Sequence, residues 1–256
     1  MSGHDIGLPA PNSGWALFLD FDGTLVEIAE RPDAIRVERR LAGTLGRLSG
    51  LLGGAVAIVS GRPLAEIDRH LSPARLPAAG LHGLELRPRP DRPGRSRRAG
   101  AIPQQVVARL EDFAGRAGLL LEHKGPAMAL HYRNRPDLAD LCRSVVREAV
   151  RDLPDLHVLD GKMVLEVKPA GGDKGRAVRA FMQHAPFRGR VPVFVGDDIT
   201  DEDGFRAVNE LGGFGVKVGA GPTLARYRAD SVPELRAWLE RAVSCLANGA
   251  GKGVEG

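Results

Sequence analysis

The hydrophobic pattern alternates between short apolar runs and amphipathic stretches in the first and last parts of the chain. Continuous apolar runs bounded by turn residues predict strands that are buried on both faces, as in a parallel sheet. We expect such strands at 15–19, 55–59, 77–86, 191–195 and 213–218. Apolar residues at helical spacing predict helices at 37–48, 64–71, 174–184, 201–210 and 233–246. This order favours a Rossmann-like α/β core with right-handed crossovers.

The pattern in the middle of the chain is different. Two helical stretches, 103–118 and 136–153, are each followed by two short strand patterns. These strands are expected at 119–124, 127–133, 156–159 and 163–168, with Asp160-Gly161 as a hairpin turn. The order predicts a smaller α+β domain inserted into the core. We therefore expect a core at 1–101 and 170–247, an inserted domain at 102–169, and a disordered glycine-rich tail at 248–256.

Length and composition narrow the class of protein. A chain of 256 residues can bury a core without disulfides. Cys142 and Cys245 have no CxxC spacing and are interpreted as free thiols, which suits a reducing compartment. We find no apolar stretch of transmembrane length and no signal-peptide pattern at the N-terminus. The expectation is a soluble cytoplasmic protein with no membrane partner.

The net charge of +4 is modest, and much of the basic excess lies in residues 87–98, RPRPDRPGRSRR. A basic cluster can bind nucleic acid or attract anionic substrates. Here the prolines favour an irregular, solvated loop, and the cluster has no aromatic residues on which bases could stack. We therefore do not expect a nucleic-acid partner.

Polar residues follow three of the predicted strands, where open α/β sheets bind their ligands. They are Asp20 and Asp22 in DFDGT, Ser60 and Gly61 in VSGR, and Asp197, Asp198 and Asp201 in GDDITD. A further charged residue, Lys174, stands at the start of a predicted helix. Carboxylates in this number suit Mg²⁺, while a hydroxyl, an ammonium and glycine N–H groups suit phosphate. One aspartate can then act as a nucleophile and another as an acid and base. A DxDG sequence by itself is also common in ordinary turns. The prediction of a site therefore depends on all of these groups occurring in one chain.

The motifs DFDGT, VSGR, GGDKG and GDDITDED, in this order, resemble those of the haloacid dehalogenase superfamily, and the inserted domain resembles its C2-type cap. Within that superfamily the chain is most similar to the trehalose-6-phosphate phosphatases, from about residue 15 to residue 239. The finer similarities are SGRP, GLHGLE, HYR, LEVKPAGGDKG and GDDITDEDGF. The resemblance implies hydrolysis of trehalose 6-phosphate through an aspartyl-phosphate, and a functional pairing with a trehalose-6-phosphate synthase.

The resemblance also implies roles for individual residues. Asp20 would be the nucleophile and Asp22 the acid and base, with Mg²⁺ on Asp20, Asp197 and the main-chain carbonyl of Asp22. Ser60, Gly61 and Lys174 would hold the phosphoryl group, and Asp198 and Asp201 would support the metal ligands. The sugar would be bound by Glu122, Lys124, Arg133 and Glu166 of the cap. Thr24 and Arg62 are expected to be structural or to support the site residues. His82 could contact the substrate, but a structural hydrogen bond within its loop is favoured.

Two other functions remain open at this point. One is a capped phosphatase for another sugar phosphate, such as sucrose 6-phosphate or mannosylglycerate phosphate, because the catalytic motifs do not separate these substrates. The other is an inactive sugar-phosphate sensor. The presence of both Asp20 and Asp22 argues against a sensor, since binding alone does not need two such acids.

Overall fold

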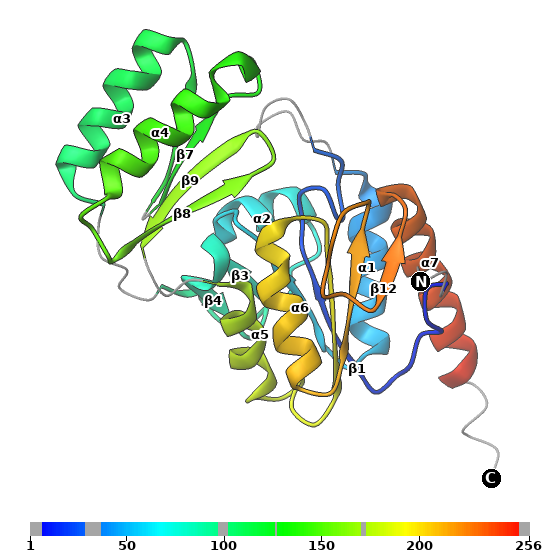
Figure 1. Cartoon of the computed structure of the whole chain (residues 1–256). Coiled ribbons are helices and arrows are strands. Elements are labelled where there is room, and N and C mark those ends of the chain that lie inside the picture. The colour runs from blue at the N-terminus through cyan, green and yellow to red at the C-terminus, as the bar shows by residue number, and fades with distance from the viewer. Residues whose placement is uncertain (1–6, 29–36, 97–101, 126, 170–172, 251–256) are drawn as a thin grey trace. The chain divides into compact units, whose positions relative to one another are not determined.

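The computed structural model describes residues 7–28, 37–96, 102–125, 127–169 and 173–250 (Figure 1). The chain forms two compact units. The first comprises Met1–Arg95 and Asp173–Gly256, and the second comprises Ser96–Gly172.

The first unit is built on an eight-stranded sheet with the order β12-β11-β10-β1-β2-β3-β4-β5. Its strands are β1 (Trp15–Leu19), β2 (Val56–Val59), β3 (Ala78–Gly80), β4 (Glu85–Arg87), β5 (Arg95–Ser96), β10 (Val191–Gly196), β11 (Phe214–Val218) and β12 (Tyr227–Ala229). The six strands from β12 to β3 run parallel, and β4 runs antiparallel to β3. Parallel strands end at a common edge, so the loops after β1, β2 and β10 are neighbours.

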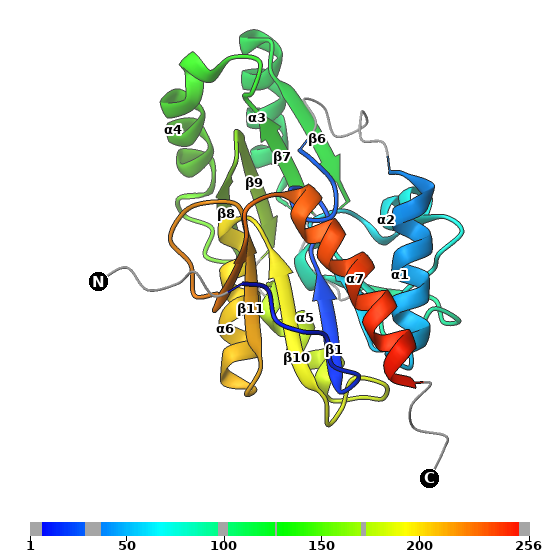
Figure 2. The same cartoon turned by 90° about the vertical axis from the view of Figure 1, so that its right-hand side faces the viewer.

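Helices cover both faces of this sheet, as Figure 2 shows. They are α1 (Arg39–Leu51), α2 (Leu64–Leu71), α5 (Lys174–Met182), α6 (Glu202–Glu210) and α7 (Val232–Ala250). Side chains along β1 point alternately to the two faces of the sheet. Leu17 and Leu19 pack with α1, α2 and α7 on one face, and Ala16 and Phe18 pack with α5 and α6 on the other. Because β1 is buried on both faces, its sequence is a continuous apolar run.

The second unit is a four-stranded antiparallel sheet with two helices. The strands are β6 (Leu120–Lys124), β7 (Ala127–His131), β8 (Leu156–Gly161) and β9 (Val164–Pro169), in the order β6-β7-β9-β8. Apolar residues on one face of this sheet pack against α3 (Gln104–Ala117) and α4 (Ala139–Val150). Strand alternation places Glu122, Ala129 and Glu166 together on the other face.

The expected strands and helices exist, but four details were wrong. Residues 77–86 form not one strand but β3 and β4, separated by a 3₁₀ turn (Leu81–Gly83) in which left-handed backbone at Leu81 and His82 reverses the chain. The hairpin turn between β8 and β9 lies at Lys162-Met163, because Gly161 is still paired with Val164. Strands β5 and β12 were not predicted. Residues 248–250, expected to be tail, belong to α7, and 251–256 lie outside the described residues.

No helix within the described ranges has both the length and the apolar character needed to cross a membrane. Both cysteines are free, with Cys142 buried and Cys245 exposed.

Candidate active site

Asp20 lies at the centre of the carboxyl edge of the large sheet. Its N–H donates to Val195 O of β10 (2.9 Å), and the residue is only 4% exposed. Leu19, the residue before it, is in register with both Val195 and Ile58. The loops that carry Asp20, Ser60 and Asp197 therefore start from neighbouring strands at the same level, as the sequence pattern predicts.

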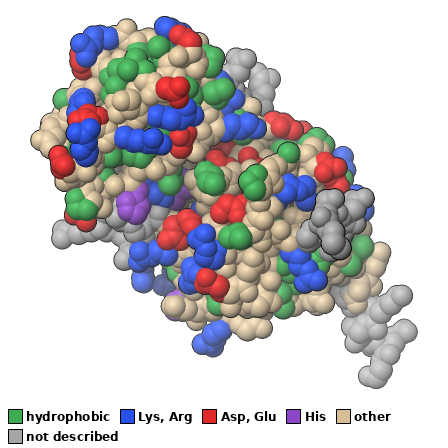
Figure 3. Space-filling view, in the orientation of Figure 1, with side chains coloured by type: hydrophobic (Ala, Val, Ile, Leu, Met, Phe, Trp, Pro, Cys, Tyr) green, Lys and Arg blue, Asp and Glu red, His purple; other side chains and the backbone are tan. Residues whose placement is uncertain are grey.

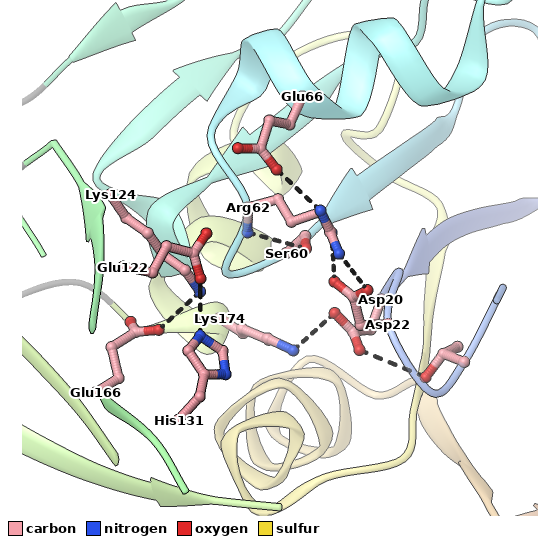
Figure 4. Close-up of polar contacts among 11 residues, drawn as sticks. Asp20, Asp22, Ser60, Arg62, Glu66, Glu122, Lys124, His131, Glu166 and Lys174 are labelled. Atoms are coloured by element: carbon pink, nitrogen blue, oxygen red, sulfur yellow. Dashed lines mark hydrogen bonds and ion pairs between the residues drawn. The ribbon is translucent and has the colours of Figure 1, made fainter. Parts of the chain in front are cut away.

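Lys174 connects two carboxylates in the interior of the site. Its Nζ lies 2.8 Å from Asp20 Oδ1 (Figure 4). It also lies 2.6 Å from Asp201 Oδ1. Lys174 is the first residue of α5, whose N-cap is Asp173. Burial opposes the charged ammonium, but the Asp20 and Asp201 carboxylates outweigh burial and raise the pKa of Lys174 above its ordinary value. The lysine is therefore a fixed positive charge beside Asp20.

Asp201 and Asp198 shape the loop that follows β10. Asp201 Oδ2 accepts the N–H groups of Asp197 and Asp198, both at 2.9 Å, and Asp198 Oδ1 accepts Thr200 N–H at 2.7 Å. Asp201 and Asp198 thus form a capping box around the short helix Ile199–Asp201. Both oxygens of Asp201 are occupied by protein donors, which fits the supporting position expected for it.

Carboxylate oxygens of Asp20, Asp197 and Asp201 lie within 4.8 Å of one another. Burial raises the pKa of Asp20 well above its usual value, and the Asp201 carboxylate adds to this while Lys174 opposes it. Burial and then Asp201 raise the pKa of Asp197 to about 7. A divalent cation with oxygen ligands would relieve this crowding of negative charge, so the residues present fit such an ion.

The DFDGT loop and β11 hold Asp197 from two sides. Thr24 Oγ1 donates to Asp197 Oδ1 at 3.0 Å. Gly23 has a φ of +82°, and a Cβ there would lie 2.2 Å from Asp197 Oδ2, so glycine is required for both reasons. Lys217 of β11, which is buried, donates to the main-chain oxygen of Asp197. Sequence reasoning did not find Lys217, although a lysine within an apolar strand was a visible signal.

The carboxylate of Asp22 is bound by Arg62. The Nε and one terminal nitrogen of Arg62 lie 2.7 and 2.9 Å from its two oxygens. Another nitrogen of Arg62 binds Glu66 at 2.9 Å, and the guanidinium lies over the ring of Phe21. From the sequence, Arg62 was expected to be structural or to support a residue of the site. Its contact with Asp22, the predicted acid and base, is of the second kind.

Ser60 is 1% exposed, and its Oγ accepts the N–H of Arg62 at 3.2 Å. The neighbouring Gly61 lies against His82, because a Cβ at this position would be 2.7 Å from His82 Nε2. His82 N–H in turn donates to the main-chain oxygen of Ser60 (3.0 Å). These contacts give His82 a structural part in the turn after β2.

A separate polar cluster lies on the sheet of the second unit. Glu122 and Glu166 are both in register with Ala129, one on each side. Lys124 Nζ is 3.5 Å from Glu166 Oε2 and 3.8 Å from Glu122 Oε2, and His131 Nε2 is 2.9 Å from Glu122 Oε2. His131 was not assigned from the sequence, although it begins HYR. Arg133 instead donates to Lys162 O (3.2 Å), at the turn between β8 and β9.

The trehalose-phosphatase family matches residues 18–233 of this chain. The chain belongs to the trehalose-phosphatase family. It is 41% identical to the trehalose-6-phosphate phosphatase of Escherichia coli over 239 residues, 93% of this chain and 90% of that protein. It is 42% identical to a probable trehalose-phosphate phosphatase of Sinorhizobium fredii over 91% of this chain and 88% of that protein.

A trehalose-phosphatase fold is also seen in the solved structures. The chain matches the C-terminal domain of the Candida albicans trehalose-6-phosphate phosphatase with a TM-score of 0.80 and 22% identity. The match covers 94% of this chain and 99% of that domain. The predicted fold class, an α/β core with a parallel sheet into which a smaller α+β domain is inserted, is confirmed by the sheet topology and by this match.

Proposed function

We propose that this chain is a Mg²⁺-dependent phosphatase that hydrolyses trehalose 6-phosphate to trehalose and phosphate. The observation that carries the proposal is the buried group of Asp20, Lys174 and Asp201 at the carboxyl edge of a trehalose-phosphatase fold. It supplies a nucleophile next to a fixed positive charge, which is what transfer of a phosphoryl group requires.

The reaction would have two steps. First, an oxygen of the Asp20 carboxylate attacks phosphorus, the bond from phosphorus to the sugar oxygen breaks, and Asp22 donates its proton to that oxygen. Then Asp22, now a carboxylate, takes a proton from water, which attacks the aspartyl-phosphate and releases phosphate. Lys174 and Ser60, with the N–H of Gly61, would bind the oxygens of the transferred group.

Asp20 and Asp197, with the main-chain carbonyl of Asp22, would hold Mg²⁺, and Asp198 and Asp201 would keep their loop in place. When bound, the cation reduces the repulsion between the anionic phosphate and the carboxylates. Thr24 and Lys217 fix Asp197 through its carboxylate and its main-chain oxygen.

The second unit, interpreted as a C2-type cap, would recognise the sugar through the polar face that carries Glu122, Lys124 and Glu166. Charged groups that accept and donate hydrogen bonds suit the many hydroxyls of trehalose. Arg133 lies near the turn of this sheet and is retained as a weaker candidate for the sugar. Two free cysteines fit a reducing compartment, so we place the enzyme in the cytoplasm. Its functional pairing with a trehalose-6-phosphate synthase is proposed from the family alone.

The experiment is a comparison of phosphate release from trehalose 6-phosphate, sucrose 6-phosphate, mannosylglycerate phosphate and an aryl phosphate, with Mg²⁺ and with a chelator. The proposal expects Mg²⁺-dependent turnover with a strong preference for trehalose 6-phosphate. Preference for another sugar phosphate would keep the chemistry and reject the sugar assignment. Binding of trehalose 6-phosphate with no turnover of any compound would identify a sensor instead.

A further inference from the structure

The basic loop that begins at Arg87 is folded onto the first unit. The guanidinium of Arg87 is buried and binds both oxygens of Asp68 (2.6 Å each). Further on, Arg92 N–H donates to Arg89 O, which closes a turn. A Cβ on Gly94 would lie 2.4 Å from Leu64 Cδ1, so the chain there is packed directly on α2. The irregular solvated loop expected from the sequence is therefore anchored at both ends; Arg97 and Arg98 lie outside the described residues.

This loop forms one wall of a surface hollow of about 440 Å³. We call it the arginine hollow, and its lining includes Arg89, Arg92, Arg95, Pro93, His184 and Ala185. A hollow of this volume lies within the range of small-molecule sites. Its walls combine positively charged side chains with proline and alanine surfaces.

The charge in the arginine hollow is only partly neutralised. Arg89 binds both carboxylate oxygens of Asp91, at 3.1 and 3.3 Å. Arg92 and Arg95 make no side-chain hydrogen bond or ion pair with any residue that the structure describes. Arg92 also helps to lower the pKa of Asp91, after Arg89, so one carboxylate faces two arginines and the hollow keeps an excess of positive charge.

The arginine hollow lies at the opposite end of the first unit from Asp20. Strand β4 runs back from Glu85, which pairs with Gly80 at the carboxyl edge, to Arg87, which pairs with Ala78 at the amino edge. On the other wall, His184 follows α5, which runs about 12 Å along its axis from Lys174 to Met182. A molecule in the hollow would therefore not compete for the space of the substrate phosphate.

We propose that the arginine hollow binds an organic diphosphate, an anion with two linked phosphoryl groups on a ring-containing body. Guanidinium groups bind phosphate oxygens in pairs, so each of the two can bind one of two linked phosphoryl groups. The proline and alanine surfaces would contact the ring. Figure 3 shows basic and acidic side chains intermixed on the face that it draws.

The test is calorimetric titration of the whole chain with ADP and with pyrophosphate, at low salt and with a chelator. The variant is Arg92→Gln with Arg95→Gln. The matched control is Arg47→Gln with Arg241→Gln, which removes the same charge from exposed arginines of α1 and α7. We expect ADP to bind at least as tightly as pyrophosphate, with affinity reduced at least about tenfold in the variant and unchanged in the control.

Four results would overturn the proposal. The first is no heat of binding when the natural chain is titrated with millimolar ADP, and the second is that the variant binds ADP as tightly as the natural chain. The third is that the control pair loses as much affinity as the variant. The fourth is that the chain binds pyrophosphate but not ADP. Retention of a single-stranded oligonucleotide that depends on Arg92 and Arg95, without binding of ADP, would assign the loop to nucleic acid instead. Unchanged phosphatase turnover in the variant is expected, and thermal melting checks that it is folded.

Discussion

Arg62 binds Asp22 through two nitrogens and both carboxylate oxygens, at 2.7 and 2.9 Å. The same guanidinium is held by Glu66 and lies over Phe21, while the Asp22 side chain is 35% exposed. A partly open carboxylate is thus held in one orientation by a buried cation. Negative charge on Asp22 outweighs burial and raises the pKa of Arg62, so this cation stays charged at all relevant pH values.

Replacing Arg62 tests whether this orientation matters for turnover. Arg62→Lys keeps the charge but cannot bind both oxygens in the same plane, so we expect kcat to fall about tenfold or more with little change in KM. Steady-state kinetics on trehalose 6-phosphate measures both. Glu66→Gln is the matched control, because it loosens Arg62 without touching Asp22, and it should cost much less. Equal kcat values for Arg62→Lys and the natural chain would reject the positioning role.

Asp20→Asn should lower kcat by at least about a thousandfold, because an amide cannot form the aspartyl-phosphate. The variant should melt at the same or a higher temperature, since the Asp20 carboxylate is buried next to Asp201, and both burial and this neighbour raise its pKa. Phosphate release and thermal melting are the two measurements. Activity near that of the natural chain would exclude Asp20 as the nucleophile.

The stabilisation that Mg²⁺ gives should depend on pH. The pKa of Asp197 is raised to about 7, so the folded, metal-free chain binds a proton there more tightly than the unfolded chain does. The stability from this group is complete below about pH 4 and is lost as the pH rises through about 7. Mg²⁺ replaces the proton, so it should raise Tm more at pH 8 than at pH 5.5.

Asp197→Asn is the control for this effect. With no ionisable group at position 197, the rise in Tm caused by Mg²⁺ should differ less between pH 8 and pH 5.5, although Asp20 still contributes to the difference. Thermal melting with and without Mg²⁺ measures it. An equal rise in Tm at both pH values in the natural chain would show that Asp197 does not hold the cation.

His131 should affect sugar recognition through Glu122, to which its ring is hydrogen-bonded at 2.9 Å. We expect His131→Ala to raise KM for trehalose 6-phosphate about tenfold and to leave the turnover of an aryl phosphate unchanged. His123→Ala is the matched control, since His123 also pairs with a glutamate, Glu111, but lies on the opposite, helix-covered face of the same sheet. Equal effects of the two substitutions would mean that only the stability of the sheet had changed.

The sequence by itself determined the elements and the order in which the site residues occur. The apolar run before Asp20 predicts a buried parallel strand, because both of its faces must contact helices, and α2 begins and ends where its pattern indicates. The motifs after β1, β2 and β10 could be placed at one edge because parallel strands must end there. These inferences need only local periodicity and the geometry of a parallel sheet.

The tertiary structure decided which side chains meet. The reversal at His82, the pairing of Arg62 with Asp22 and the hold of Lys217 on Asp197 join residues that are distant in sequence, and periodicity carries no information about such pairs. The raised pKa of Asp197 likewise depends on burial and on Asp201, which only the packed loop supplies. The sequence specifies the chemical type of each side chain. The distances between side chains, their exposure to solvent and the charges around them are set only when the chain has folded.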